Sequence, residues 1–451
     1  MKKTLILTLI LLFGLLCSPA EAWALSAGDI TAEAAVLMDA GTGQILYAKN
    51  MDRKMYPASI TKILTGLLAM EYASPAEVIT VSGSAVDLPR NTSHIALTEG
   101  ERITVDEAMY AMLLPSANDA ANALAEHVSG SQEAFAELMN RKAAALGATG
   151  SHFANAHGLP DVNHYTTALD MALITRAAAR NEDFLRYFGT TRHTMSPTNR
   201  QEGERFFTNQ QYMLLPDMWV YDPTVLGGKV GWTTEARHTM STVARRDGRT
   251  LVCVVLGSGI DDKFYDTEKL LDYGFGEFVE YTIPSAELEA ASVPIEGDGA
   301  EVGYAAFRAE EDIHLLLHRS IDPRNILRVY DYPALLARDG PMEGYLLLEV
   351  EEAGLDSLPS LLMRVPLTPE VTMLGMVDAA EQEPPLPEQS GGILRLLLRV
   401  AVVAAIVAAG LFALLVLVRI RVRRTVRRRR RKRREELLRR RREPDAASPW
   451  E

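Results

Sequence analysis

Cysteine is almost absent from this chain of 451 residues, which contains only Cys17 and Cys253. Cys17 lies in an N-terminal segment that we expect to be cleaved, so the mature chain keeps one thiol and forms no intramolecular disulfide. Cys253 lies in an apolar run, residues 251–256, and we expect its thiol to be buried. This scarcity excludes the class of small secreted folds that depend on disulfides.

The N-terminus has the parts of a secretory signal. Two lysines at positions 2 and 3 precede an apolar run over residues 5–16, and residues 20–24 offer small side chains that suit cleavage after Ala22 or Ala24. We therefore expect residues 1–24 to be a signal peptide and the folded body to be exported.

Positive charge is scarce except near the C-terminus. The net charge is −12, but residues 419–442 contain sixteen basic residues and two glutamates, so this segment carries +14 and the rest of the chain −26. An uncharged run of nineteen residues, 400–418, directly precedes the basic segment and is long enough to cross a bilayer. The chain thus combines an acidic body with a basic end.

These segments predict a single transmembrane helix, residues 393–418, followed by a cytoplasmic basic tail, residues 419–451, with the body outside the membrane. A basic tail is also typical of nucleic-acid arms. Beside a membrane span, however, anionic lipid headgroups are the nearer partner, and we expect no nucleic-acid binding. Residues 377–392 are rich in proline and then glycine, which predicts a stalk before the helix.

The body between the signal and the stalk has an α+β pattern. Apolar runs at 34–38 and 44–48 flank a turn sequence and predict a β-hairpin, and residues 239–245 and 250–257 predict a second one. Helical periodicity dominates from Ser59 to about Arg180. Strands at both ends of this segment therefore enclose helices, in a domain that we place at residues 27–280.

A second domain is predicted after this one, where the helical periodicity fades. Strand-like pieces at 313–318, 326–330 and 345–350 indicate a small all-β domain, which we place at residues 283–376.

One short stretch carries a candidate nucleophile. Pro57 precedes a periodic apolar run, which predicts the first turn of a buried helix and places Ser59 and Lys62 on one face. A serine hydroxyl needs a base to take its proton, and a buried amine one turn away is suited to that task. A lone S-x-x-K is more often a capping serine followed by a solvated lysine, so this stretch alone decides nothing.

Two further polar clusters interrupt apolar patterns. Ser116 and Asn118 lie between two predicted helices, where the hydroxyl is suited to proton transfer and the amide to holding a peptide, although either is equally typical of a helix N-cap. Residues 227–233 form a glycine-rich strand that a ligand can approach closely, and Lys229 supplies a positive charge for a carboxylate. Taken singly, this third cluster is a glycine-rich strand edge.

Together, in this order, the three clusters resemble the S-x-x-K, S-x-N and K-T-G motifs of the serine penicillin-binding proteins and serine β-lactamases. Four longer stretches and the C-terminal anchor resemble the low-molecular-mass D-alanyl-D-alanine carboxypeptidases of bacterial cell walls. These stretches are residues 55–62, 113–120, 155–159 and 270–275. The resemblance is strong over about residues 30–280 and weak through the β domain.

The resemblance implies a β-lactamase/DD-peptidase-like domain, with an antiparallel sheet flanked by helices and a helical subdomain. It also implies serine acyl transfer on peptidoglycan stem peptides ending in D-Ala-D-Ala, covalent inhibition by β-lactams, no metal or cofactor, and a place at the bacterial cell membrane. By the same resemblance Ser59 is the nucleophile, Lys62 its base and Ser116 the proton relay. The substrate would be bound by Asn118, Lys229, Gly231, Trp232 and Thr233, with the oxyanion held by the backbone N–H groups of Ser59 and Trp232.

One position departs from the family pattern. Val230 stands where the family usually has a threonine whose hydroxyl donates to the substrate carboxylate, so we expect a loss of about 1.5–3 kcal/mol in binding. Two alternatives therefore stay open: a penicillin-binding sensor or weakly active enzyme, and a serine β-lactamase. The second is less favoured because no Glu-x-x-x-Asn stretch occurs in residues 155–200.

Other residues allow competing interpretations. Imidazole and carboxylate side chains in residues 152–170 are suitable zinc ligands, but their spacing matches no metal motif. The residues concerned are His152, His157, His164, Asp161 and Asp170. We interpret residues 155–159 as a turn near the cleft. Trp219, Tyr221 and Trp232 suggest a platform for sugar stacking, but we favour a place in the core.

Overall fold

The computed structural model describes residues 25–288, 291–350 and 358–374. The predicted signal peptide, stalk, transmembrane helix and basic tail lie outside the described residues. None of the helices in the described ranges has both the length and the hydrophobicity needed to span a bilayer.

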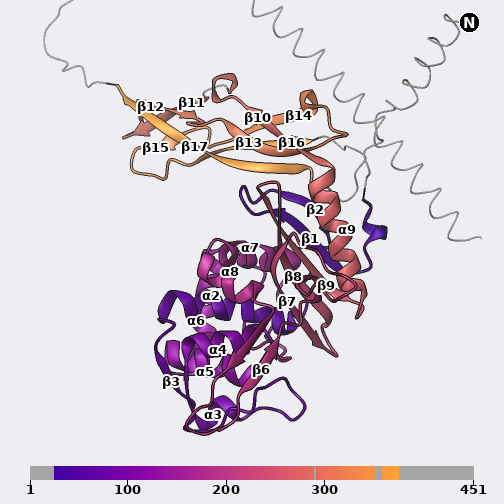
Figure 1. The fold of residues 1–451 in the computed structure, drawn as a ribbon. Coiled ribbons are helices and arrows are strands. Elements are labelled where there is room, and N and C mark those ends of the chain that lie inside the picture. The colour runs from indigo at the N-terminus through magenta and orange to yellow at the C-terminus, as the bar shows by residue number, and fades with distance from the viewer. Residues whose placement is uncertain (1–24, 289–290, 351–357, 375–451) are drawn as a thin grey trace, which may run out of the picture. The chain divides into compact units, whose positions relative to one another are not determined.

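A five-stranded antiparallel sheet forms the centre of the first domain (Figure 1), with strand order β2-β1-β9-β8-β7. Its strands are β1 (Ala34–Asp39), β2 (Ile45–Lys49), β7 (Val225–Thr233), β8 (Arg237–Arg246) and β9 (Arg249–Ser258). Both predicted hairpins are confirmed, because β1 pairs with β2 and β8 with β9. The glycine-rich strand β7 lies at one edge, where only one neighbour occupies its backbone groups.

The sheet is buried on both faces, and its sequence shows why. Alternate residues of β1 and β9 belong to two different hydrophobic cores, with Val36 and Val254 in one and Leu37 and Cys253 in the other. Since neighbouring residues of a strand point to opposite faces, near-continuous apolar strands need cover on both sides. Cys253 is fully buried as expected, and burial raises the pKa of its thiol to about 12.

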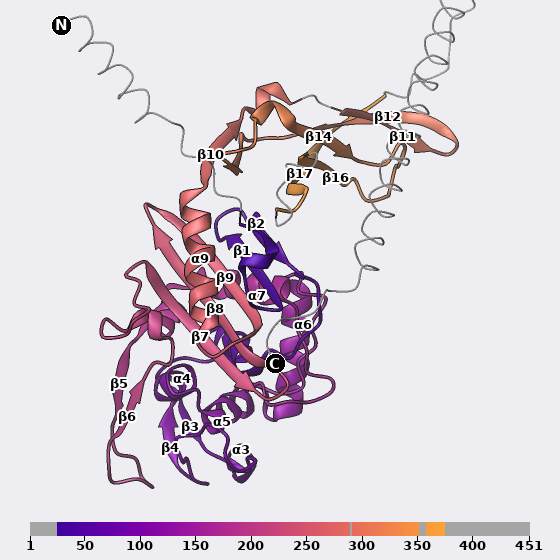
Figure 2. The ribbon, with the colours of Figure 1, turned by 90° about the vertical axis from the view of Figure 1, so that its right-hand side faces the viewer.

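Helices supply that cover. The helix α9 (Asp262–Gly276) packs its apolar side on one face of the sheet, and the other helices gather on the opposite face (Figures 1 and 2). These are α2 (Lys62–Tyr72), α3 (Gly83–Val86), α4 (Val105–Leu113), α5 (Asn118–Ser129), α6 (Gln132–Ala145), α7 (Ala168–Ala179) and α8 (Glu182–Gly189). Two small antiparallel pairs complete the domain: β3 (Val78–Thr80) with β4 (Arg102–Thr104), and β5 (Arg192–Met195) with β6 (Arg205–Thr208). The predicted enclosure of helices by strands is confirmed.

One local prediction is wrong. We expected Ser59 in the first turn of the helix that contains Lys62, but α2 begins at Lys62 itself. Ser59 lies in a short 3₁₀ turn, Ala58–Thr61, in which Ala58 has a positive φ of 51°. Short 3₁₀ turns are common at the N-terminus of an α-helix, and this one places the nucleophile candidate at the start of α2.

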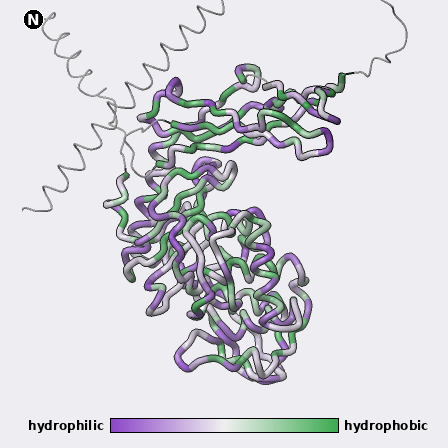
Figure 3. Tube along the Cα trace, turned by 180° about the vertical axis from the view of Figure 1, so that it is seen from behind, coloured by the Kyte–Doolittle hydropathy of each residue, from purple (hydrophilic) through white to green (hydrophobic). Residues whose placement is uncertain are grey.

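The remaining described residues form β structure with a hydrophobic core of its own. The strands β10 (Phe278–Ile283) and β13 (Ile313–His318) pair with each other. A six-stranded sheet has the order β14-β16-β17-β12-β11-β15 and consists of β11 (Ala291–Gly297), β12 (Ala300–Arg308), β14 (Ile326–Asp331), β15 (Leu336–Ala337), β16 (Gly344–Val350) and β17 (Leu361–Met373). The three strands predicted here are confirmed. Figure 3 shows hydrophobic and hydrophilic residues interleaved along the described chain.

Candidate active site

The three predicted clusters meet at the edge of the sheet beside β7. The Nζ atom of Lys62 lies 3.0 Å from the Oγ atom of Ser59 and 2.7 Å from the side-chain oxygen of Asn118. A third contact, of 2.7 Å, joins the same nitrogen to the backbone carbonyl oxygen of His157. Lys62 is fully buried, whereas Ser59 is partly exposed. The serine is thus open to a ligand while its neighbouring amine is shielded from water.

These contacts define what the amine can do. Burial lowers the pKa of Lys62 well below its ordinary value, the positive charge of Lys229 lowers it further, and Asp119 opposes both effects. A neutral amine has two N–H groups and one lone pair. The two carbonyl oxygens, of Asn118 and His157, accept the N–H groups, which leaves the lone pair for the hydroxyl of Ser59. The arrangement is suited to proton abstraction from Ser59.

The turn at residues 155–159 lies beside this pair, as expected. Asn155 accepts a hydrogen bond of 2.7 Å from the backbone N–H of Gly158, which folds the turn so that the carbonyl of His157 faces Lys62. Gly158 has a φ of +91°, and a Cβ atom placed on it would lie 1.9 Å from the carbonyl oxygen of Ala58. Only glycine therefore allows the turn to touch the backbone that precedes Ser59.

His157 and His164 are held as neutral rings. Burial lowers the pKa of His157 to about 3 and that of His164 to about 4. The backbone N–H of Ala154 donates to Nδ1 of His164, so its Nε2–H donates to the hydroxyl of Thr61, 2.9 Å away. His164 therefore supports the turn that carries Ser59. Within the described ranges no three His, Cys, Asp or Glu residues are grouped to hold a metal ion.

Ser116 has an unusual backbone and an unused hydroxyl. It lies just before α5 with a φ of 69°, a left-handed conformation that disfavours residues other than glycine by about 1–2 kcal/mol. Its Oγ atom is buried and makes no hydrogen bond to any described residue. The alternative of an N-cap is wrong for both candidates, because α5 starts at Asn118 and its N-cap residue is Ala117. A strained serine with a free hydroxyl is available to a ligand.

The strand β7 carries two further predicted site residues, Lys229 and Gly231. Lys229 is buried, its Nζ atom donates to the carbonyl of Val230 at 3.0 Å, and burial lowers its pKa to about 7. A Cβ atom on Gly231 would lie 2.6 Å from the backbone nitrogen of Ser59, so the glycine lets the strand lie directly against the nucleophile candidate. Thr233 lies at the strand end, where its hydroxyl accepts from the N–H of Ala236.

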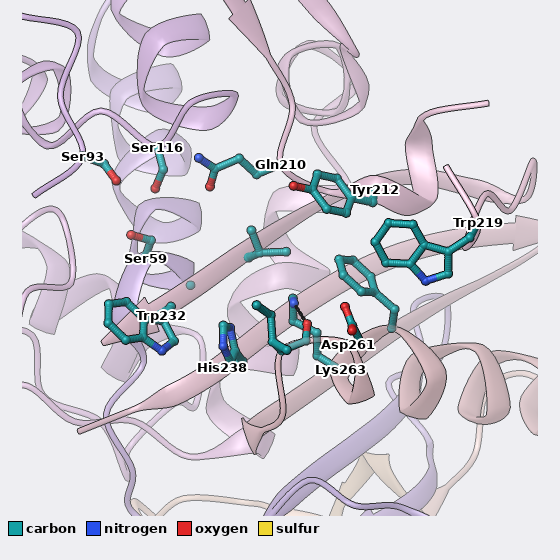
Figure 4. A pocket seen from close by; sticks show the side chains of 14 residues that line it. Ser59, Ser93, Ser116, Gln210, Tyr212, Trp219, Trp232, His238, Asp261 and Lys263 are labelled. Carbon is teal, nitrogen blue, oxygen red and sulfur yellow. Dashed lines mark hydrogen bonds between the residues drawn. The ribbon is translucent and has the colours of Figure 1, made fainter. Parts of the chain in front are cut away.

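A cavity of about 450 Å³ is lined by four of the predicted site residues: Ser59, Ser116, Gly231 and Trp232. The other four, Lys62, Asn118, Lys229 and Thr233, are not among its lining residues. Ser59, Ser116 and Trp232 lie at one end, and Tyr212 and Trp219 lie at the other (Figure 4). Other lining residues lie outside the three motifs: Ser93, Gln210, Tyr212, His238, Ile260, Asp261, Lys263 and Phe264. Burial lowers the pKa of Lys263 to about 8, and its amino group donates to the carbonyl of Ile260.

The expected core positions of three aromatic residues are wrong. Trp219, Tyr221 and Trp232 are 58%, 44% and 62% exposed. Trp219 and Trp232 both line the cavity. Hydrophobicity alone did not separate them from core residues, but the prolines at 216 and 223 mark a loop around Trp219 and were a usable signal of exposure.

Comparison with known proteins gives consistent matches. A family profile described as D-alanyl-D-alanine carboxypeptidase matches residues 21–259. DacF of Bacillus subtilis, a D-alanyl-D-alanine carboxypeptidase, is 30% identical over 305 residues, which cover 65% of this chain and 76% of that protein. DacC of Escherichia coli, with the same description, is 32% identical over 302 residues, covering 63% and 71%.

Solved structures agree with these matches. The D-alanyl-D-alanine carboxypeptidase of Mycobacterium tuberculosis is 28% identical, with a TM-score of 0.51, and the match covers 57% of this chain and 95% of that one. Penicillin-binding protein 5 of Haemophilus influenzae is 25% identical, with a TM-score of 0.58, covering 76% and 98%.

Proposed function

The chain belongs to the D-alanyl-D-alanine carboxypeptidase family, and we propose that it removes the terminal D-alanine from peptidoglycan stem peptides through an acyl-enzyme on Ser59. One observation carries the proposed chemistry. The buried Nζ atom of Lys62 lies 3.0 Å from Ser59 Oγ while two carbonyl oxygens engage its N–H groups. This geometry supports a serine with its own general base.

The first chemical step forms the acyl-enzyme. Ser59 Oγ attacks the carbonyl carbon of the penultimate D-alanine as its proton moves to Lys62. The negative charge that develops on the carbonyl oxygen is stabilised by the backbone N–H groups of Ser59 and Trp232, at about 3 kcal/mol per donor. The close approach of β7 at Gly231 supports this pairing, because it brings the two backbone segments together.

The second step releases D-alanine. The peptide C–N bond breaks, and Ser116 relays the proton from Lys62 to the leaving amine, which uses the hydroxyl that has no partner in the described chain. Lys229 binds the terminal carboxylate, and a carboxylate beside it favours its protonated form. Asn118 holds the peptide backbone from a position fixed by Lys62. Water then attacks the acyl carbon and frees Ser59.

We also propose where the enzyme works. Residues 1–24 direct export, residues 27–280 form the catalytic domain, and residues 283–376 form a β domain that spaces it from the membrane. Residues 393–418 anchor the chain as a single span, with the stalk outside and the basic tail in the cytoplasm. The order of signal, acidic body, apolar run and basic end supports this topology. β-Lactams, as acylating analogues of the substrate, are expected to inhibit the enzyme covalently at Ser59.

The test combines two readouts on the same preparations. Wild-type protein is expected to release D-alanine from a stem-peptide mimic ending in D-Ala-D-Ala and to be labelled by a fluorescent penicillin. Ser59→Ala is expected to lose both. Ser93→Ala removes another hydroxyl that lines the same cavity, so it serves as the matched control and is expected to keep both.

Each departure from this pattern has a defined meaning. Labelling of wild-type protein without D-alanine release contradicts turnover and favours a penicillin-binding sensor. Labelling of Ser59→Ala contradicts the assignment of the nucleophile.

A further inference from the structure

The cavity extends well beyond the residues needed to cut D-Ala-D-Ala. On β7, Gly231 lies against the backbone of Ser59, and Val230 beside it lines the same cavity as Phe264. Figure 4 shows Tyr212 and Trp219 at the end opposite Ser59.

The direction of the substrate decides what reaches that end. This step rests on the proposed function, in which Ser59 attacks the penultimate carbonyl and Lys229 binds the terminal carboxylate. On β7, Lys229 precedes Gly231 by two residues, in the direction of Val225, which belongs to the same hydrophobic core as Phe264. The departing C-terminal residue therefore lies between Ser59 and the aromatic end, and the rest of the stem extends the other way.

The aromatic end consists of Tyr212 and Trp219 packed on the buried ring of Phe264, over which the amino group of Lys263 lies at 4.2 Å. The ring of Tyr212 stacks on Phe264 at 5.5 Å and 14°, and Trp219 meets both rings edge-on at 5.8 and 6.3 Å. Trp219 is 58% exposed and Ile260 65% exposed, although both line the cavity. Grouped exposed apolar side chains in a cavity are typical of a binding surface.

Val230 continues this apolar surface toward the reaction centre. It lines the cavity and packs against the core that contains Phe264. A threonine at this position would place a hydroxyl on that path, whereas valine presents methyl groups of nearly the same shape. Val230 and Trp219 thus both contribute apolar side chains to the same cavity.

We propose that this surface is a subsite for the side chain of the departing residue, and that the enzyme preferentially trims stem peptides whose C-terminal D-residue has a bulky apolar side chain. The methyl group of D-alanine would leave most of the aromatic end unfilled. The chemistry is unchanged: the bond between the penultimate carbonyl carbon and the terminal nitrogen breaks, Ser59 is acylated, and a free D-amino acid leaves with the relayed proton.

The experiment compares three synthetic stem peptides that differ only in the last residue, D-Ala, D-Leu or D-Lys, with release of that amino acid as the readout. A single added methylene in an apolar pocket is worth about 10- to 200-fold in discrimination. We expect wild-type kcat/KM to be at least about tenfold higher for the D-Leu peptide than for the D-Ala peptide. A preference for D-Ala overturns the inference. A preference for D-Lys does so too, because it would indicate recognition of an amine by Asp261.

Variants identify the surface responsible. Trp219→Ala is expected to bring the D-Leu to D-Ala ratio down to about one, and Val230→Thr is expected to lower it as well. Tyr265→Ala removes an aromatic ring of α9 that is 44% exposed and does not line the cavity, and it is expected to keep the wild-type ratio. An unchanged ratio in both Trp219→Ala and Val230→Thr overturns the inference. If the enzyme releases D-alanine but shows no preference for the D-Leu peptide, the subsite is contradicted and the proposed function stands. If no peptide is cleaved, both the subsite and the proposed function are contradicted.

Discussion

Replacing Gly158 by alanine is expected to damage catalysis without touching a catalytic side chain. The added Cβ atom would lie 1.9 Å from the carbonyl oxygen of Ala58 and 2.4 Å from its carbonyl carbon. Cβ atoms essentially never approach other atoms within 3.0 Å, so the two backbone segments must separate by about 1.1 Å. One segment carries Ser59, and the other presents the carbonyl of His157 to Lys62.

The substitution has two effects, and their sizes differ. Alanine at a φ of +91° is strained by about 1–2 kcal/mol, which lowers the free energy of unfolding. A displacement of about 1 Å between reacting groups lowers a rate by about 100-fold. We therefore expect a modest loss of stability and a loss of about 100-fold in the rate of acylation at Ser59.

The assay is the second-order rate of labelling by a fluorescent penicillin, together with chemical denaturation. Gly248→Ala is the matched control, because Gly248 has a similar φ of +84° and nothing lies within 4 Å of a Cβ atom placed there. This control is expected to lose similar stability and to acylate at the wild-type rate. Wild-type acylation by Gly158→Ala would refute the positional argument, and equally slow acylation by Gly248→Ala would show that strain alone is responsible.

Three other substitutions test the role of Val230 and the charges around Lys62. Val230→Thr is expected to raise kcat/KM for D-Ala-D-Ala about tenfold in steady-state assays, because a donor to the carboxylate is restored. The pH profile of wild-type kcat/KM is expected to be bell-shaped: activity falls at low pH as Lys62 gains a proton, and falls above about pH 7 as Lys229 loses one. Lys229→Gln is expected to abolish the alkaline limb and to move the acid limb to higher pH, since removal of the neighbouring positive charge raises the pKa of Lys62; an unmoved acid limb would contradict this coupling. Asp119→Asn is expected to lower the free energy of unfolding by about 1–3 kcal/mol, because its carboxylate accepts backbone N–H groups of the loop between α3 and β4. The same variant is expected to move the acid limb to lower pH, and both effects are measurable on one preparation.

The sequence was sufficient for the parts of the fold that depend on periodicity. The hairpins of β1 with β2 and β8 with β9 follow from apolar runs on either side of short turn sequences. The three motifs also come together as predicted, with Ser59, Lys62 and Asn118 in contact and Gly231 against the backbone of Ser59.

Other features of the site have no clear signature in the sequence. The carbonyl of His157 holds Lys62, but every residue has a carbonyl, so nothing in the sequence marks this one. The left-handed backbone at Ser116 is imposed by tertiary structure on a residue that does not favour it. Trp219 is as hydrophobic as a core residue, and its position in the folded chain determines that it lines a cavity.

The assignment of Lys62 as the base of Ser59 is tested most directly by the rate of penicillin acylation in Lys62→Met. Methionine approximates the length of lysine and fills the buried space, but it cannot accept a proton. A general base contributes about 10²- to 10⁴-fold to a rate, and we expect a loss in that range in a variant that remains folded. Labelling of Ser59 at the wild-type rate in this variant would contradict the mechanism.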